Sequence, residues 1–511
     1  MSLEHLIKKI IGSLLFAGAL AISGNALAQE AEPKFDKYDG FCYGQFRKNQ
    51  NPDKGVHPIK REIKEDISHA SKFTKCVRSY GATQSGLDVP EACREEKLDC
   101  YAGAWIGKYK IENEKEISNL IKIANSNNPY VKGVVVGNEV LLRKDLAKQE
   151  YLEYIQRVKK EAKVPVGIAE TWKVLLENKD LAEYADFILV HIHPYWDGVS
   201  IEKAVEHVFE KYELVKKAFP GKNVIIGETG WPSRGDKVGK AVPSLENQVR
   251  FFESFTKQAK EKKIPYFYFE VFNEEWKIKF EGKAGAYWGI FNSDGSLDPM
   301  YKQFLPKEAM AGIKRPARIV EKVKVNAPVT IYSDGGSDDN HFQPTGWMTD
   351  EKNYINLEKE LSVERDCREN PHSGKSCTKI TYSPGGLNAM RKWAGIFWQH
   401  PINNWGEYPG YEINGQVSKA TFWARGEKGG EKIKFQAGGI NCEPHNNPEK
   451  PYKDSFGPVE KWMKLTKDWQ KYEINLRGED LSNVIGGFCF ATSFLDNNGG
   501  CVFYLDDIVI E

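Results

Sequence analysis

Two stretches of the chain end alike, Val134-Val135-Val136-Gly137-Asn138-Glu139 and Val224-Ile225-Ile226-Gly227-Glu228-Thr229-Gly230-Trp231-Pro232. In each, a continuous apolar run stops at a glycine, and a glutamate follows within two residues. Such runs are typical of strands that are buried on both faces, as in parallel sheets. Parallel strands of a β/α barrel deliver their functional residues at their carboxyl ends. The pattern therefore predicts that Glu139 and Glu228 face one central cleft.

The sequence around these stretches alternates short apolar strands with amphipathic helical segments from residue 37 to residue 306. Eight strands alternating with helices over this length predict a closed (β/α)8 barrel. Counted along the chain, Glu139 follows the fourth strand and Glu228 the seventh. The strands are expected at 41–44, 76–80, 100–105, 133–136, 164–168, 187–191, 224–226 and 266–269, and the clearest helices at 116–124, 148–162, 201–219 and 245–262.

The pattern changes after residue 306. Residues 307–326 are charged and contain Pro316, which suits a linker. From 327 to 511 the predicted strands are short, alternating and separated by Gly, Asn and Pro, and no long helical period intervenes. This arrangement is typical of an all-β sandwich or jelly roll.

Length and charge agree with a two-domain protein that does not bind nucleic acid. The 511 residues exceed what one hydrophobic core usually serves. The 72 basic and 71 acidic residues nearly cancel, so no electrostatic footprint for nucleic acid or an anionic membrane is expected.

The N-terminus is typical of a secretory signal peptide over residues 1–28. Lys8 and Lys9 precede an apolar region too short to span a bilayer, and Ala26-Leu27-Ala28 forms a cleavage site. Nine cysteines fit an oxidising compartment, and Cys93/Cys100 and Cys367/Cys377 are close enough to close small loops, although the connectivity stays open. A secreted or periplasmic protein without a membrane span is therefore expected.

Two carboxylates that face one cleft have the chemistry to cleave a glycosidic bond. One donates a proton to the leaving oxygen, and the other attacks the anomeric carbon. For a single glutamate, capping a strand or pairing with a lysine is the more common role; two in matching contexts favour catalysis.

Several motifs resemble those of glycoside hydrolase family 17, which comprises retaining β-1,3-glucan hydrolases and related transglycosylases. They are 135–140 (Val-Val-Gly-Asn-Glu-Val), 226–233 (Ile-Gly-Glu-Thr-Gly-Trp-Pro-Ser), 77–81 (Val-Arg-Ser-Tyr-Gly), 169–172, 194–196, 272–277 and 287–291. The resemblance spans residues 38–299 and implies Glu139 as general acid/base and Glu228 as nucleophile, with no cofactor for catalysis. His193 and an apparent inserted loop at 85–99 depart from the family pattern.

The same resemblance and the strand-end positions indicate further candidate residues for substrate binding. Asn138 is expected to bond the sugar 2-hydroxyl, and Tyr80 the nucleophile, although a core tyrosine is an equal alternative there. Glu170, Glu274 and Lys277 either touch sugar or orient the catalytic pair. Two or three strand-end aromatic side chains are expected to line subsites and the rest to be core; the candidates are Trp105, Trp172, Tyr195, Trp196, Trp231, Trp276 and Trp288.

The ending 503–508 (Phe-Tyr-Leu-Asp-Asp-Ile) resembles the last strand of galactose-binding-like jelly rolls found in carbohydrate-binding modules. That resemblance covers 327–511 and implies a possible structural calcium ligand at Asp506 or Asp507, with a solvent-facing turn as the alternative. The aromatic stretch 393–406, expected between strands, supplies Trp398, Trp405 and the nearby Tyr408 as sugar-stacking candidates or core residues.

Three hypotheses follow. The first is an exported endo-β-1,3-glucanase with a carbohydrate-binding partner domain, whose polysaccharide substrate is a β-glucan. The second is a β-glucan transglycosylase, which would form products longer than its substrate. The third is a non-catalytic glycan-binding protein that retains the barrel as a scaffold.

Overall fold

The computed structural model describes residues 35–349, 360–385, 392–441, 447 and 449–511. The predicted signal peptide, with its cleavage site after Ala28, lies outside the described residues. Among the described residues, no helix is long and apolar enough to cross a membrane.

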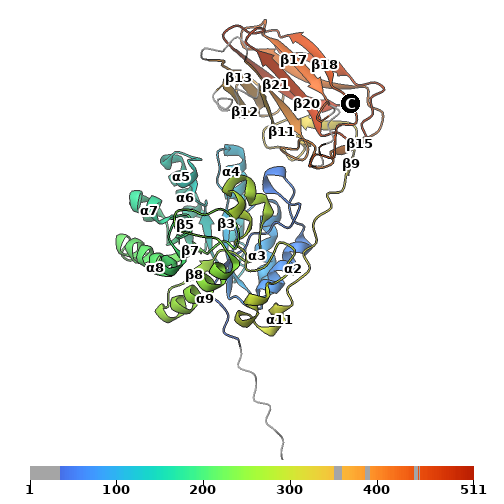
Figure 1. The fold of residues 1–511 in the computed structure, drawn as a ribbon. Helices are drawn as coiled ribbons and strands as arrows, with labels where there is room; N and C mark the ends of the chain where they lie inside the picture. The colour runs from blue at the N-terminus through green and yellow to red at the C-terminus, as the bar shows by residue number, and fades with distance from the viewer. Residues whose placement is uncertain (1–34, 350–359, 386–391, 442–446, 448) are drawn as a thin grey trace, which may run out of the picture. The chain divides into compact units, whose positions relative to one another are not determined.

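The first domain is a closed barrel of eight parallel strands in sequential order, as the sequence predicts (Figure 1). The continuous apolar runs become strands whose residues are almost all buried, and Glu139 and Glu228 belong to the ends of the fourth and seventh strands. The strands are β1 Phe41–Cys42, β2 Cys76–Arg78, β3 Asp99–Ala104, β4 Val131–Val136, β5 Val166–Thr171, β6 Phe187–His191, β7 Asn223–Thr229 and β8 Tyr266–Tyr268.

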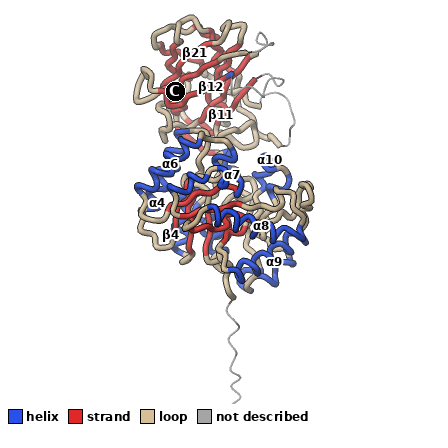
Figure 2. Tube along the Cα trace, turned by 90° about the vertical axis from the view of Figure 1, so that its left-hand side faces the viewer, coloured by secondary structure: helices blue, strands red, loops and turns tan. Residues whose placement is uncertain are grey.

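Helices enclose the strands on the outside of the barrel (Figure 2). In the long helices the apolar residues recur at helical spacing, so each of these helices buries one face and exposes the opposite one. The helices are α2 Lys60–Ala70, α3 Val89–Glu95, α4 Lys110–Ala124, α5 Val140–Arg143, α6 Lys148–Glu161, α7 Trp172–Glu177, α8 Ile201–Ala218, α9 Leu245–Lys262, α10 Ile278–Glu281 and α11 Lys307–Met310.

The segment 85–99 is not an inserted loop, contrary to the prediction. It contains α3, the helix that connects β2 to the parallel strand β3. Pro90 stands in the first turn of α3, where its missing N–H has no intrahelical partner in any case. The short length of α3 hides its helical period in the sequence.

The second domain is the predicted β-sandwich. One sheet has the order β12-β13-β21-β16-β19, with β10 paired to β21, and the other has the order β11-β14-β20-β17-β18. The strands are β9 Val323–Asn326, β10 Val329–Tyr332, β11 Gln343–Thr349, β12 Leu361–Cys367, β13 Cys377–Tyr382, β14 Trp393–Gln399, β15 Tyr411–Asn414, β16 Lys419–Gly426, β17 Lys432–Ala437, β18 Val459–Lys464, β19 Gln470–Asn475, β20 Gly486–Ser493 and β21 Cys501–Ile510.

The predicted linker 307–326 is not a free tether over its whole length. Arg315 is 1% exposed, and its guanidinium makes two 3.0 Å bonds to Asp66 on α2. It also lies 3.8 Å above the ring of Phe272. The segment around Arg315 therefore belongs to the barrel, and β9, at the other end, pairs with β15.

The eight cysteines of the described chain carry free thiols. Cys367 and Cys377 are direct cross-strand partners of β12 and β13. Cys442 lies outside the described residues. Disulfide pairing therefore stays a prediction.

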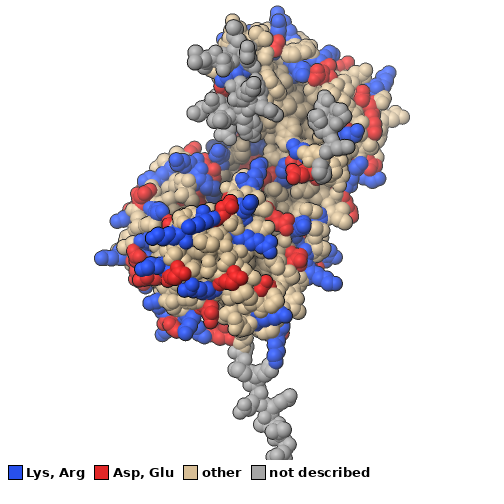
Figure 3. Space-filling model, in the orientation of Figure 1, with Lys and Arg blue, Asp and Glu red and all other residues tan. Residues whose placement is uncertain are grey.

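Charges of both signs are interspersed over the visible surface of the barrel domain (Figure 3). Many of them form exposed ion pairs, such as Lys64–Glu95 and Lys159–Asp186. No single-sign field is visible on that face, in agreement with the near-neutral net charge of +1.

Candidate active site

Glu139 lies in a tight turn between β4 and α5. Gly137 has φ +75°, and a Cβ added there would lie 2.5 Å from Val140 Cγ2, so only glycine fits. Glu139 itself has φ +53°, a left-handed conformation that costs a non-glycine residue about 1–3 kcal/mol. The turn is held by a 2.9 Å bond from the Glu139 N–H to the Ala169 carbonyl. The strained backbone of Glu139 therefore carries a side chain that is partly accessible, at 21% exposure.

Glu228 lies within β7, and its side chain is 7% exposed. Oε1 accepts from the Tyr80 hydroxyl at 2.9 Å and from Arg78 Nη1 at 3.2 Å, and Oε2 lies 3.2 Å from His193 Nε2. Burial by itself would raise the pKa of this carboxyl, but the hydrogen bond from His193 and the positive charge of Arg78 outweigh it and hold the pKa well below its ordinary value. Glu228 is therefore ionised.

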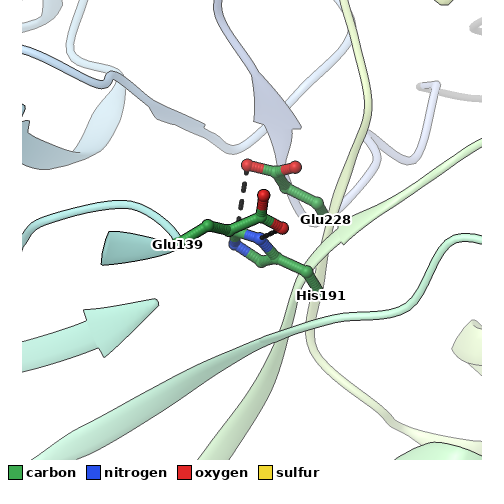
Figure 4. Close-up of side chains that lie close together, drawn as sticks. All are labelled: Glu139, His191 and Glu228. Carbon is green, nitrogen blue, oxygen red and sulfur yellow. Dashed lines mark hydrogen bonds and ion pairs between the residues drawn. The ribbon is translucent and has the colours of Figure 1, made fainter. Parts of the chain in front are cut away.

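His191, at the end of β6, lies between the two carboxylates (Figure 4). Its Nδ1 is 2.8 Å from Glu139 Oε1, and its Nε2 is 3.5 Å from Glu228 Oε1. One oxygen of Glu139 and one of Glu228 lie within 4.8 Å of each other. The carboxyl ends of β4, β6 and β7 thus bring the predicted pair together around one imidazole.

Within the described chain, Glu139, His191 and Glu228 form the one group of at least three side chains whose ligand atoms lie close enough to hold a metal ion. The guanidinium of Arg78 is 1% exposed and donates into this group, to Glu228 at 3.2 Å and toward His191 at 2.8 Å. A cation bound there would meet this fixed positive charge at close range. The arrangement favours proton and glycosyl chemistry over metal binding.

Asn138 is joined to the same network. Its Oδ1 accepts from Arg78 Nη2 at 2.5 Å, and its backbone carbonyl accepts from Arg143. Because Oδ1 is engaged, the amide nitrogen is the group that remains to donate toward a ligand. Asn138 is half-buried beside Glu139, where the sequence predicted it.

Glu170, at the end of β5, does not face outward to a ligand. It is fully buried, and Oε1 accepts at 2.8 Å from the N–H of Leu141, two residues after Glu139. Burial raises the pKa of Glu170 to about 7, and the charge of Glu139 adds to the effect. Of the two predicted roles, the structure supports the positioning of the acid/base turn.

Glu274 and Lys277 form a buried ion cluster with Glu270, and their role in touching sugar or orienting the catalytic pair stays a prediction. Lys277 Nζ lies 2.8 and 2.7 Å from the two oxygens of Glu270 and 2.7 Å from Glu274. These three contacts use all of its donors. Burial by itself would lower the pKa of Lys277, but the two carboxylates outweigh it and raise the pKa.

Trp231 and Tyr195 belong to the core, the alternative that the sequence left open for the aromatic candidates, because both are buried in the barrel. Trp231 is 0% exposed and donates to the Val242 carbonyl at 3.2 Å; Tyr195 is 1% exposed and donates to the Asp236 carbonyl at 2.6 Å. Trp105 and Trp196, each 43% exposed, are the exposed aromatic side chains of the candidate set.

The remaining strand-end aromatics divide between core and partial exposure. Trp288 is 0% exposed and packs against His193 and Trp196. Trp172 is half-buried; its Nε1 donates to Asp197 at 3.0 Å, and two lysines lie over its ring. Its place in substrate binding stays a prediction.

In the sandwich, the stretch 393–406 was expected to lie between strands, but its first half forms strand β14. This strand lies between β11 and β20 in its sheet. Trp398 is part of the core and is 0% exposed, which selects the core role from the two predicted for it. Trp405 and Tyr408 are half-buried in the loop after β14, where Trp405 packs edge-on against Phe397. Sugar binding by this domain stays a prediction.

Asp506 and Asp507 lie at a bend of β21. Asp506 is 0% exposed, and its oxygens accept from the backbone N–H groups of His372, Ser373 and Asp507. Asp507 bonds the side chains of His372 and Ser373 at 2.7 and 2.8 Å. Both carboxylates thus fasten the loop before β13, and calcium binding stays a prediction.

Three residues that touch the catalytic pair were not predicted as site residues: Arg78, His191 and His193. All three stand at or just after strand ends, the position that identified Glu139 and Glu228. Arg78 lies inside a quoted family motif, and the two histidines flank Ile192. Strand-end position was the available signal, but the sequence does not show which end residues point to the barrel axis.

Residues 40–289 match the model of the BtgE/BtgC glycoside hydrolase domain. A putative glucan endo-1,3-beta-glucosidase btgC of Aspergillus niger is 29% identical over 281 residues, which are 48% of this chain and 40% of that protein. The cell surface mannoprotein MP65 of Candida albicans is 29% identical over 248 residues, 47% of this chain and 64% of that protein.

Among solved structures, a glycoside hydrolase family 17 beta-1,3-glucanosyltransferase of Rhizomucor miehei matches with TM-score 0.46 and 27% identity over 52% of this chain and 96% of that one. An endo-laminarinase of Formosa matches with TM-score 0.48 and 20% identity over 56% of this chain and 91% of that one.

The family match falls on the barrel, and the chain spans about 40% of the length of the glucosidase relative. The family match covers the strand ends that carry Glu139 and Glu228. The barrel of this chain is thus a glycoside hydrolase domain, and it is similar to the BtgE/BtgC glycoside hydrolase domain whose model it matches.

Proposed function

We propose that the barrel cleaves β-1,3-glucan internally, with retention of configuration, through a glycosyl-enzyme on Glu228. The observation that carries the proposal is the approach of one oxygen of Glu139 and one of Glu228 to within 4.8 Å. Retaining glycosidases hold their carboxyl groups about 5–5.5 Å apart, whereas inverting ones need about 6.5–9.5 Å to admit a water.

In the first step, Glu139 donates its proton to the glycosidic oxygen while Glu228 attacks the anomeric carbon. The bond between that carbon and the leaving oxygen breaks, and a bond from the carbon to a Glu228 oxygen forms. Glu228 suits the nucleophile because Tyr80, Arg78 and His193 keep it ionised. Glu139 suits the acid/base because it is the more exposed of the pair, at 21% against 7%.

In the second step, Glu139 takes a proton from water, and the water oxygen attacks the anomeric carbon. The bond to Glu228 breaks, and both carboxylates return to their starting states. The amide nitrogen of Asn138 is placed to bond the sugar 2-hydroxyl, a contact that strengthens toward the transition state.

The substrate class is supported by the relatives. The Aspergillus niger protein, which is 29% identical over 48% of this chain, is named a putative glucan endo-1,3-beta-glucosidase. Trp105 and Trp196, which are exposed beyond the ends of β3 and β6, suit stacking on sugar faces.

The test is the activity of the full-length protein on laminarin, with Glu228→Ala, Glu139→Ala and the surface control Glu153→Gln. We expect both active-site variants to lose more than a thousandfold in kcat and Glu153→Gln, exposed on α6, to match wild type. Added azide should yield a β-glycosyl azide with Glu139→Ala and an α-glycosyl azide with Glu228→Ala. Undiminished activity of Glu228→Ala, or exchanged azide products, would refute the assigned roles.

The same assay separates hydrolysis from transfer. With a short laminarioligosaccharide of defined length, a hydrolase forms only shorter products. Products longer than the substrate would instead establish the transglycosylase alternative on the same two glutamates.

We further propose that the protein acts outside the cytoplasm. One relative is named a cell surface mannoprotein, and residues 1–28 are typical of a signal peptide. Cell fractionation after expression of the full chain tests this proposal; retention of the enzyme with the cytoplasmic fraction would contradict it.

A further inference from the structure

His191 is the one side chain of the described structure that lies within 3.5 Å of both catalytic glutamates (Figure 4). The ring is fully buried, and each of its nitrogens has a near neighbour. Nδ1 is 2.8 Å from Glu139 Oε1, and Nε2 is 2.8 Å from Arg78 Nη1. These two contacts decide where the ring carries its proton.

Arg78 settles the protonation of Nε2. A guanidinium is always protonated in a protein, so Arg78 Nη1 presents only N–H groups. Two nitrogens 2.8 Å apart cannot both point a hydrogen at each other, so Nε2 must offer its lone pair. Arg78 is held in place by the Gly227 carbonyl at 3.0 Å and by Asn138 at 2.5 Å, and it cannot turn away. His191 is therefore neutral, and its single ring proton is on Nδ1.

The proton on Nδ1 in turn settles the state of Glu139. Nδ1 donates, so Glu139 Oε1 is the acceptor of the 2.8 Å bond. An oxygen that already accepts a hydrogen bond from the ring is the poorer place for the catalytic proton. The charged and titratable groups that face the ring are Glu139 from the end of β4, Arg78 from β2 and Glu228 from β7.

We propose that His191 is a positioning residue that assigns the catalytic proton to Oε2 of Glu139. This inference rests on the acid/base role of Glu139 proposed above. During glycosylation the Oε2–H bond breaks and its proton moves to the leaving oxygen, while His191 keeps its own proton. The negative charge left on Glu139 is stabilised by the Nδ1–H donor. In the second step water returns a proton to Oε2.

His193, two residues after His191, differs from it in which glutamate it contacts. Its Nε2 approaches only the nucleophile, Glu228 Oε2, at 3.2 Å, and its ring packs edge-on against Trp288 and Phe269. Loss of His193 should therefore affect the nucleophile, whereas loss of His191 should affect the acid/base. The two histidines make a matched pair for experiment.

The kinetic test compares His191→Asn and His191→Gln on two substrates. The amide nitrogen of Asn takes the position of Nδ1 and keeps the bond to Glu139, while the longer Gln places its amide at Nε2. The first substrate is a laminarioligosaccharide, whose leaving group needs a proton. The second is a dinitrophenyl β-glycoside of the same sugar, whose leaving group needs none.

We expect His191→Gln to lose at least about tenfold in kcat/KM on the oligosaccharide and less than threefold on the dinitrophenyl substrate. His191→Asn should recover most of that loss. His193→Gln should lose activity on both substrates. Equal losses of His191→Gln on both, or no difference between Asn and Gln, would overturn the inference.

The tautomer is also measurable without any activity. In the full-length wild-type protein labelled with 15N-histidine, the signals absent from His191→Asn identify the ring. We expect one protonated nitrogen, Nδ1. An Nε2–H tautomer or a charged ring would overturn the inference. A wild-type enzyme inactive on both substrates would refute the proposed function and leave this result standing.

Discussion

Glu170 is a buried carboxyl directly behind the acid/base, and replacing it with glutamine should stabilise the barrel at alkaline pH only. Its side chain is fully buried, and its Oε1 accepts from the Leu141 N–H at 2.8 Å. Glutamine keeps this acceptor and the volume of the side chain but cannot ionise. The variant therefore isolates the cost of holding a charge at this position.

The expected gain in stability follows from the pKa of Glu170. Burial raises the pKa of Glu170 from 4.5 to about 7 in the folded protein. Between these values the folded state binds more protons than the unfolded state, so stability falls as pH rises. A shift of about 2.5 units at 1.36 kcal/mol per unit amounts to about 3 kcal/mol, fully lost only above pH 7. Glu170→Gln should match wild type at pH 4 and exceed it by about 3 kcal/mol at pH 8.5.

Differential scanning calorimetry of the full-length protein at the two pH values measures this difference. For a domain of this size, about 3 kcal/mol corresponds to roughly 6 °C in the Tm of the barrel. Burial also raises the pKa of Asp454 in the sandwich to about 7. Asp454 titrates in the same way in wild type and in Glu170→Gln, so its effect cancels from the difference in Tm between them. The surface control Glu153→Gln should leave the Tm unchanged at both pH values. An equal shift at both pH values, or a lower Tm at pH 8.5, would refute the reasoning.

Three further outcomes are expected. Tyr80→Phe removes a donor to Glu228 at 2.9 Å, so kcat/KM on laminarin should fall about tenfold to a hundredfold in steady-state assays, and a loss below threefold would argue against the contact. Asp66→Asn leaves Arg315 buried without its charge partner and should lower the free energy of unfolding in urea by about 3–5 kcal/mol; a loss below 1 kcal/mol would contradict this. Trp196→Ala removes a 43% exposed ring and should raise KM for laminarin about fivefold with kcat nearly unchanged, whereas an unaltered KM would exclude this subsite.

Much of the barrel could be predicted because its signals are local. The apolar runs, their glycines and the helical periods are each contained within some 20 residues, and they gave the strand order and the positions of Glu139 and Glu228. The short α3 was missed because too few residues carry its period. The exposed and buried faces of β14 could not be separated in a stretch so uniformly aromatic and polar.

The sequence by itself therefore determined the barrel with its following all-β region and the strand-end positions of Glu139 and Glu228, because a strand end is recognisable from the residues beside it. Only the tertiary structure decided what surrounds that pair. Arg78 and His191 are 113 residues apart along the chain, yet their nitrogens lie 2.8 Å from each other. Trp398 lies inside the sandwich and Trp196 lies exposed on the barrel, although both are tryptophans in aromatic stretches. Closure of the barrel and the direction of each side chain fix these contacts, and no local pattern encodes them.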